Sequence, residues 1–171
     1  MAKVIFITGG QRSGKSSFAQ NEALKLSPSP VYLATSRIWD DDFKKRVDRH
    51  KIDRSENWIN IEEEKEISKY DFSGKVVVLD CITLWLTNYF SDYNYDVDTS
   101  LNEAKKEWNK FIQKDFTVFV ISNEIGMGIH GETEGARKFT DLQGWMNQYI
   151  AKQANEVILM ISGIPVTIKN D

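Results

Sequence analysis

Short runs of apolar residues recur along the chain and predict buried β-strands. They lie at residues 4–8, 31–34, 76–79, 117–121 and 157–161. Because each run is continuous rather than alternating, the strands are predicted to be covered on both faces, which is typical of a mainly parallel sheet. A further short run at 166–168 follows Gly163-Ile164-Pro165. This spacing predicts a terminal hairpin that closes one edge of the sheet.

Helical periodicity alternates with these runs. Residues 101–112 and 135–154 each carry apolar positions three and four residues apart, and residues 17–24 predict a helix after the first strand. Residues 89–98 are rich in Asp, Asn and Tyr, which predicts an exposed loop or an oligomer contact. The alternation predicts an α/β, three-layer fold with a mainly parallel central sheet.

Composition narrows the class of protein. The 171 residues fit a single domain spanning 1–171. The 22 Lys and Arg against 25 Asp and Glu give a net charge of −3, which argues against a nucleic-acid surface and favours small-molecule substrates. One cysteine, Cys81, excludes an intrachain disulfide framework. Neither a signal peptide nor an apolar run of membrane-spanning length is found, so a cytoplasmic protein is expected.

The most specific motif follows the first strand. It is the phosphate-binding loop, or P-loop, Gly9-Gly10-Gln11-Arg12-Ser13-Gly14-Lys15-Ser16. Its glycines let backbone N–H groups turn toward a phosphate, and the following helix adds the positive end of its dipole. Lys15 is predicted to reach the outer phosphates and the Ser16 hydroxyl to ligate Mg²⁺. A glycine-rich turn without a ligand is the alternative. Because strand, loop and helix follow in this order, the three-layer α/β fold is predicted to be like that of the P-loop nucleoside triphosphate hydrolases.

Acidic residues at strand ends are candidates for a second metal-binding position. In P-loop enzymes a carboxylate at the tip of a neighbouring strand orients Mg²⁺. Asp80 ends the run at 76–79 and is the first candidate, against the alternative of a solvated turn residue. Glu124 follows the strand at 117–121 and is a weaker candidate at the same sheet edge.

A basic segment at residues 40–54 contains His50. On a helix Phe43, Val47, His50 and Arg54 would share one face. A neutral imidazole is a competent nucleophile at phosphorus, and neighbouring guanidinium groups stabilise the transferring charge. The composition alone also fits a solvated basic face with a structural histidine. The other histidine, His130, lies in a glycine-rich stretch that predicts a mobile loop and is not expected to be catalytic.

Together these segments resemble the bifunctional adenosylcobinamide kinase/adenosylcobinamide-phosphate guanylyltransferase family of cobalamin biosynthesis. The resemblance covers nearly the whole chain. It rests on residues 8–16, Tyr32-Leu33-Ala34-Thr35-Ser36, Arg46-Val47-Asp48-Arg49-His50-Lys51 with Arg54 and Trp58, residues 80–88, Ser122-Asn123-Glu124-Ile125-Gly126-Met127-Gly128-Ile129, Ala136-Arg137 with Phe139 and Asp141, and residues 144–148.

The resemblance implies two reactions. The first is phosphorylation of adenosylcobinamide with ATP or GTP. The second is transfer of GMP from GTP to adenosylcobinamide-phosphate through a phosphoramidate on His50, which gives adenosylcobinamide-GDP and pyrophosphate. Family members form trimers, and the Trp- and Tyr-rich residues 85–95 are expected to contribute to an interface.

The resemblance also assigns a site. Lys15 and His50 are catalytic, and Mg²⁺ is held by Ser16 and Asp80. The nucleotide is bound by Gly9, Gly10, Gln11, Arg12, Ser13, Gly14, Lys15, Ser16, Ala34, Thr35, Ser36, Lys51, Ile52, Asp53, Arg54, Glu62 and Asp80. Two rival functions are a small-molecule P-loop kinase without guanylyl transfer and a non-catalytic nucleotide switch. The switch is disfavoured because Ser122-Asn123-Glu124-Ile125 is not the Asn-Lys-x-Asp element that reads guanine.

Overall fold

The computed structural model describes residues 1–37 and 57–171, and seven of its strands form one sheet in the order β3-β2-β4-β5-β1-β6-β7. The strands are β1 (Lys3–Gly9), β2 (Val31–Ala34), β3 (Ile59–Glu62), β4 (Val76–Asp80), β5 (Thr117–Ile121), β6 (Glu156–Ile161) and β7 (Ile164–Asn170). All neighbouring strands are parallel except β6 and β7. The carboxyl ends of β1 to β6 therefore meet at one edge of the sheet.

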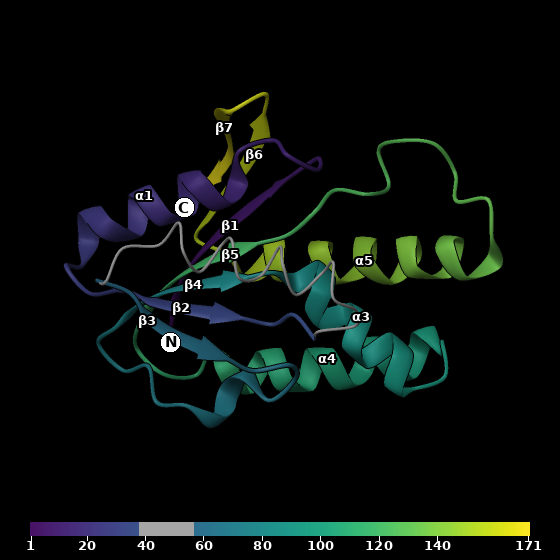
Figure 1. Cartoon of the computed structure of the whole chain (residues 1–171), viewed down its shortest axis with the longest axis horizontal. Helices are drawn as coiled ribbons and strands as arrows, with labels where there is room; N and C mark the ends of the chain where they lie inside the picture. Colours follow the sequence, from purple (N-terminus) through teal and green to yellow (C-terminus); the bar gives the residue numbers. More distant parts are fainter. Residues whose placement is uncertain (38–56) are drawn as a thin grey trace.

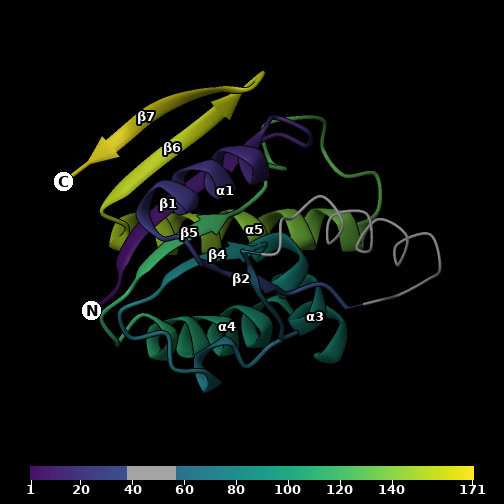
Figure 2. The ribbon, with the colours of Figure 1, turned by 60° about the vertical axis from the view of Figure 1, so that its left-hand side comes forward.

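Helices cover both faces of this sheet (Figures 1 and 2). They are α1 (Lys15–Leu26), α3 (Ile82–Asp92), α4 (Val97–Phe111) and α5 (Glu134–Gln153), with a short 3₁₀ turn η1 (Ile67–Lys69). On one face α1 buries Ala19 and Ala23 against β1, β4 and β5. On the other face α3, α4 and α5 bury a larger core that includes Trp85 and Trp108. The predicted three-layer α/β fold with a mainly parallel sheet is confirmed.

Local capping explains where two predicted helices begin. Asp96 accepts a hydrogen bond of 2.8 Å from the Thr99 N–H and starts α4 at Val97, four residues before the predicted start. Thr133 accepts one of 3.1 Å from the Ala136 N–H and starts α5 at Glu134. Within the described ranges, no helix is long and apolar enough to cross a membrane.

The predicted exposed loop at residues 89–98 is wrong for most of its length. The helix α3 extends through Asp92, and α4 begins at Val97. Tyr89 and Phe90 are buried in the core beneath this segment, together with Trp85. These three aromatic side chains pack inside the subunit, whereas Tyr95 is exposed, so the interface predicted over residues 85–95 would use exposed side chains such as Tyr95.

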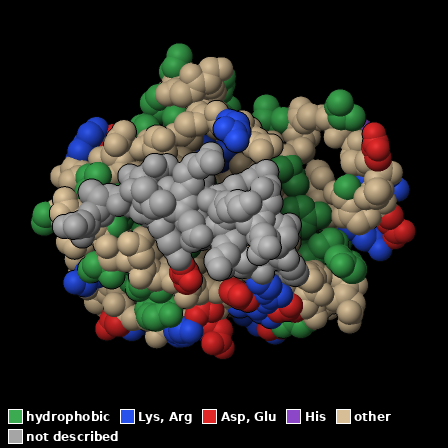
Figure 3. Space-filling model, viewed as in Figure 1, with side chains coloured by type: hydrophobic (Ala, Val, Ile, Leu, Met, Phe, Trp, Pro, Cys, Tyr) green, Lys and Arg blue, Asp and Glu red, His purple; other side chains and the backbone are tan. Residues whose placement is uncertain are grey.

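The terminal hairpin is confirmed. The strand β7 pairs antiparallel with β6 and occupies the edge of the sheet. Its tip exposes Ile161 and Ile164, and Figure 3 shows hydrophobic side chains over this end of the hairpin. The opposite edge is β3, which the sequence did not predict because Ile59–Glu62 is short, partly polar and mostly exposed. The sheet therefore has one strand more than the apolar runs indicate.

Candidate nucleotide-binding site

The P-loop connects the buried strand β1 to the helix α1. Gly9 has a φ of 150°, and a Cβ there would lie 2.6 Å from the Met160 carbonyl oxygen, so only glycine fits. Behind the loop, the Gly163 N–H in the β6–β7 turn donates a hydrogen bond of 3.0 Å to the Ser13 carbonyl. The sequence did not assign Gly163 to the site. The hairpin thus braces the loop from outside.

The Lys15 side chain is folded into the loop. Its ammonium donates hydrogen bonds to the carbonyl oxygens of Gly9 at 3.1 Å and Gly10 at 2.6 Å, and lies 3.4 Å from the Ser13 hydroxyl. Burial lowers the pKa of Lys15, and the nearby negative charge of Asp80 partly opposes this shift. A buried cation beside a turn of backbone is suited to hold an anionic phosphate, as the motif predicts.

Ser16 and Asp80 lie together at the carboxyl edge of the sheet. The Ser16 hydroxyl donates a hydrogen bond of 3.1 Å to Asp80 Oδ2, and the Tyr32 hydroxyl donates to the same oxygen. The prediction placed Asp80 on a strand beside β1, but β5 lies between β1 and β4. The contact forms nevertheless because α1 crosses β5 and reaches β4. Tyr32 lies in the motif Tyr32-Leu33-Ala34-Thr35-Ser36, but no feature of that motif indicates this contact with Asp80.

These oxygen atoms fit a magnesium ion. Mg²⁺ is usually held by one or two carboxylates together with substrate phosphates and water, rather than by a closed set of protein ligands. A hydroxyl and a carboxylate side by side at a P-loop form such a donor set. In the described part of the chain, no cluster of three or more His, Cys, Asp or Glu residues forms a separate metal site. Ser16 and Asp80 are therefore the residues that would hold Mg²⁺.

Three predicted residues that are distant in sequence are aligned across the sheet. Ala34 at the end of β2 is in register with Glu62 on β3 and with Asp80 on β4. Each ends its strand at the edge that carries the P-loop. Asp80 and Glu62 are acidic residues among the predicted nucleotide-binding positions. Asp80 contacts Ser16 on α1, and Glu62 lies on β3, two strands away from β4 in the sheet. The predicted site residues therefore lie along the sheet edge from the P-loop toward β3.

Thr35 directly follows β2, and its hydroxyl is used inside the protein. It donates to the Cys81 carbonyl at 2.8 Å and accepts from the Cys81 N–H at 3.0 Å, and the residue is fully buried. The Thr35 N–H also donates to the Asp80 carbonyl at 3.0 Å. The Thr35 hydroxyl thus links the end of β2 to the backbone of Cys81, the residue after Asp80. Ser36, the next predicted residue, is half-buried.

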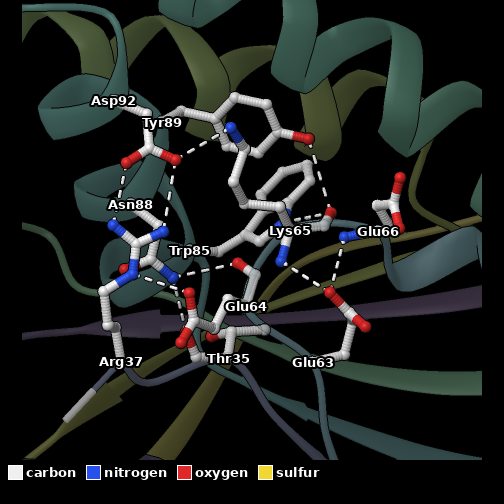
Figure 4. A network of polar contacts seen from close by, with 10 residues as sticks. All are labelled: Thr35, Arg37, Glu63, Glu64, Lys65, Glu66, Trp85, Asn88, Tyr89 and Asp92. Atoms are coloured by element: carbon white, nitrogen blue, oxygen red, sulfur yellow. Dashed lines mark hydrogen bonds and ion pairs between the residues drawn. The ribbon is translucent and has the colours of Figure 1, made fainter.

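A network of polar contacts fixes the chain beyond β2 (Figure 4). Arg37 forms a double hydrogen bond with Asp92 on α3, at 2.8 and 3.2 Å, and another with Glu64 at 2.6 Å. Lys65 also donates to Asp92, at 3.0 Å. These hydrogen bonds keep the pKa of Asp92 well below its usual range.

Asn88 forms the buried base of this network. Its amide donates to the carbonyls of Thr35 at 2.8 Å and Glu64 at 2.9 Å. These contacts tie α3 to both the β2 end and the segment after β3. Acidic and basic side chains gather over this region of the surface in Figure 3.

Five predicted site residues lie outside the described residues. They are His50, Lys51, Ile52, Asp53 and Arg54. Of the remaining predicted positions, residues 9–16 form the loop and Ala34, Glu62 and Asp80 line the adjoining sheet edge. His130 is exposed in the loop between β5 and α5.

Comparison with known proteins points to one family. Residues 5–168 match the family model CobU, described as cobinamide kinase / cobinamide phosphate guanyltransferase. The chain is 38% identical to the bifunctional adenosylcobalamin biosynthesis protein CobU of Escherichia coli K12, covering 97% of this chain and 99% of that protein. It is 29% identical to the bifunctional adenosylcobalamin biosynthesis protein CobP of Pseudomonas aeruginosa PAO1, with 96% of each covered.

A comparison with solved structures finds a protein of similar fold. A Pyrococcus horikoshii OT3 protein, solved as Project ID PH0250, shares 7% identity at a TM-score of 0.51, covering 98% of this chain and 86% of that one. At this identity the match shows a shared fold alone.

Proposed function

Because the chain belongs to the cobinamide kinase / cobinamide phosphate guanyltransferase family, we propose that it catalyses both reactions of its bifunctional relatives. It phosphorylates adenosylcobinamide with ATP or GTP and then transfers GMP from GTP to adenosylcobinamide-phosphate. The observation that carries this proposal is the family match over residues 5–168. The P-loop geometry supports it, because both reactions need a nucleoside triphosphate held by its phosphates.

Lys15 and the Ser16–Asp80 pair serve both reactions. The Lys15 ammonium exchanges its contacts with Gly9 and Gly10 for the outer phosphates of the nucleotide. Ser16 and Asp80 would hold Mg²⁺, which would neutralise charge that develops on the phosphates. Ala34, Thr35, Ser36 and Glu62 contribute the rest of the described nucleotide site, with Thr35 acting through its backbone and through Cys81.

His50 is proposed as the carrier of GMP. A ring nitrogen of His50 attacks the α-phosphorus of GTP, an N–P bond forms, and the bond to the bridging oxygen breaks as pyrophosphate leaves. An oxygen of adenosylcobinamide-phosphate then attacks the same phosphorus and releases the histidine. Support comes from the basic motif around His50, and residues 51–54 are proposed to bind the same nucleotide.

The test uses GTP labelled at either the α- or the γ-phosphate, with Mg²⁺ and with His50→Ala alongside. We expect the denatured wild-type protein to retain α-label that is stable in base, labile in acid and absent from His50→Ala. The variant should keep kinase activity, because γ-phosphoryl transfer does not pass through this histidine. A His50→Ala enzyme that transfers GMP at the wild-type rate would remove the intermediate.

The assembly and location predicted from the sequence are part of this proposal. The enzyme is proposed to be a cytoplasmic homotrimer, on the basis of the family resemblance. Residues 85–95 are proposed to contribute to the interface through exposed side chains such as Tyr95, because Trp85, Tyr89 and Phe90 are buried. Sedimentation of the purified protein would test the trimer directly.

A further inference from the structure

Glu124 lies beside the phosphate-binding lysine. The Glu124 N–H donates a hydrogen bond of 3.0 Å to the Gly9 carbonyl oxygen. The Lys15 ammonium donates to the same oxygen at 3.1 Å. Two donors on one oxygen atom must be close neighbours, so the backbone of Glu124 is fixed next to the group that holds the outer phosphates.

The chain around Glu124 is held from several sides. The Ser122 N–H donates to the Ile7 carbonyl at 2.9 Å, which continues the pairing of β5 with β1. Asn123 donates twice to the Thr83 hydroxyl, from its backbone and its side chain, both at 3.1 Å. Asn147 on α5 donates to the Asn123 carbonyl at 3.2 Å. These contacts make the position of Glu124 a rigid part of the fold.

Strand order places Glu124 between the two halves of the nucleotide site. It follows β5, which lies between β1 with its P-loop and β4 with Asp80. Other acidic residues near this edge are engaged: Asp80 with Ser16, Glu63 with Lys69 and Glu64 with Arg37. Glu124 is half-buried, and the hydrogen bonds and ion pairs of the described residues include none to its carboxylate.

The two proposed reactions differ in whether the acceptor carries a proton. In the kinase reaction the acceptor is a hydroxyl, which must lose its proton as it attacks the γ-phosphorus. In guanylyl transfer the acceptor is a phosphate monoester, which is largely ionised at neutral pH because its second pKa is about 6. A general base is needed for the first reaction and not for the second.

We propose that Glu124 is the general base of the kinase reaction; this inference rests on the proposed function. As the acceptor oxygen bonds to the γ-phosphorus, the bond to the β–γ bridging oxygen breaks and the nucleoside diphosphate leaves. The hydroxyl proton passes to the Glu124 carboxylate and afterwards to solvent. Glu124 takes no part in the transfer of GMP.

The test measures each reaction separately in Glu124→Gln. Kinase activity is assayed with adenosylcobinamide and ATP, and guanylyl transfer with GTP and adenosylcobinamide-phosphate supplied directly. We expect kcat of the kinase to fall by about 100-fold or more, the scale of a lost general base, with the KM for ATP unchanged. Guanylyl transfer should stay within about threefold of wild type, since its acceptor has no proton to lose. Glu132→Gln, an exposed position in the same loop, should leave both rates unchanged.

Several results would overturn the assignment. Parallel loss of both reactions would make Glu124 part of the shared nucleotide or metal site, and an unaffected kinase would show that it is not the base. If Glu124→Gln does not fold, as judged by thermal unfolding, Glu124→Asp replaces it, and the same selective loss of kinase activity is required. A wild-type protein that catalyses neither reaction would instead refute the proposed function.

Discussion

Ser16 and Asp80 are 64 residues apart in the sequence and are joined by a hydrogen bond of 3.1 Å between the Ser16 hydroxyl and Asp80 Oδ2. The strand β5 lies between β1, which precedes the P-loop, and β4, which ends at Asp80, so the contact depends on α1 crossing the sheet surface. A hydroxyl and a carboxylate from two separate motifs thus lie side by side at the P-loop, where the outer phosphates of a nucleotide would bind. The part of the site proposed to hold Mg²⁺ is assembled by tertiary packing rather than by a local motif.

Tyr32→Phe is expected to weaken Mg²⁺-dependent nucleotide binding. The Tyr32 hydroxyl donates to the same Asp80 oxygen as Ser16. The Tyr32 ring packs edge-on against Trp58, with the ring centroids 5.8 Å apart. Phenylalanine keeps the ring contact and removes the donor that orients the carboxylate. Loss of such a supporting hydrogen bond typically costs about 10-fold or more in metal affinity. Isothermal titration of GTP at a series of Mg²⁺ concentrations would measure the shift.

Tyr149→Phe is the matched control for this change. The Tyr149 hydroxyl donates to Asn109 Oδ1 at 3.0 Å, between α5 and α4 and away from the P-loop. It should lose a hydrogen bond without altering the Mg²⁺ dependence of GTP binding. Equal Mg²⁺ dependence in both variants would contradict a role of Tyr32 in orienting Asp80.

Gly163→Ala is expected to weaken the hydrogen bond between the β6–β7 turn and the P-loop, and with it GTP binding. Gly163 has a φ of 83° and donates to the Ser13 carbonyl at 3.0 Å. Alanine is strained by about 1 kcal/mol in this left-handed region, and relief of the strain would displace the donor. Loss of one hydrogen bond, worth about 1 kcal/mol, should lower GTP affinity by roughly fivefold. Equilibrium binding of GTP would measure it.

Gly74→Ala separates this effect from general destabilisation. Gly74 has a φ of 70°, and, as at Gly163, a Cβ there would meet no atom within 4 Å. It lies in the turn before β4, so its strain does not act on the P-loop. Both variants should lose similar stability in urea, but only Gly163→Ala should bind GTP less tightly. If the GTP affinities of both variants fall equally, the hydrogen bond from Gly163 to Ser13 does not support the P-loop.

The sequence predicts the parts of the site that depend on short-range pattern. The P-loop is recognisable because its chemistry lies within eight consecutive residues after a buried strand. Asp80 is recognisable because it ends an apolar run. Strand order is not recognisable in this way, since β5 is inserted between β1 and β4 by tertiary packing. The separation of β1 from β4 by β5 therefore follows from the structure and not from the sequence pattern.

The errors at α3 and β3 have a common physical cause. Tyr89 carries a polar hydroxyl, yet this group donates to the Lys65 carbonyl and the side chain is buried. Local composition cannot reveal partners that lie more than 20 residues away. The short strand β3 likewise depends on pairing with β2 rather than on its own apolar pattern.

Asp92→Asn is expected to lower the free energy of unfolding by about 1 kcal/mol at pH 7, the upper range for a partly exposed ion pair. Arg37 and Lys65 hold the pKa of Asp92 below its unfolded value of about 3.9. This stabilisation is present above the unfolded pKa and is lost as pH falls toward the folded pKa. Urea unfolding at pH 7 and at about pH 2, well below the unfolded pKa, should show the difference between wild type and variant shrinking at the lower pH. A difference that stays constant would exclude the charge as its source.

Thr35→Val tests whether Thr35 acts through Cys81 rather than through a side-chain contact to the nucleotide. Valine leaves the Cys81 N–H buried without its acceptor at 3.0 Å, which should cost about 2 kcal/mol of unfolding free energy. The Cys81 carbonyl keeps its bond from the Trp85 N–H, so the damage is concentrated on the N–H. Because Cys81 directly follows Asp80, Mg²⁺-dependent GTP binding should weaken as well.

Thr35→Ser retains the hydroxyl and serves as the comparison. It should cost less stability than valine, roughly the 1 kcal/mol of one lost methyl group, and it should keep the Mg²⁺ dependence of the wild type. Urea unfolding and GTP titration on both variants give the two quantities. If Thr35→Val weakens GTP binding without lowering stability, the hydroxyl must contact the nucleotide directly. Loss of both quantities in valine and recovery of both in serine would show that the buried link to Cys81 holds Asp80 in place.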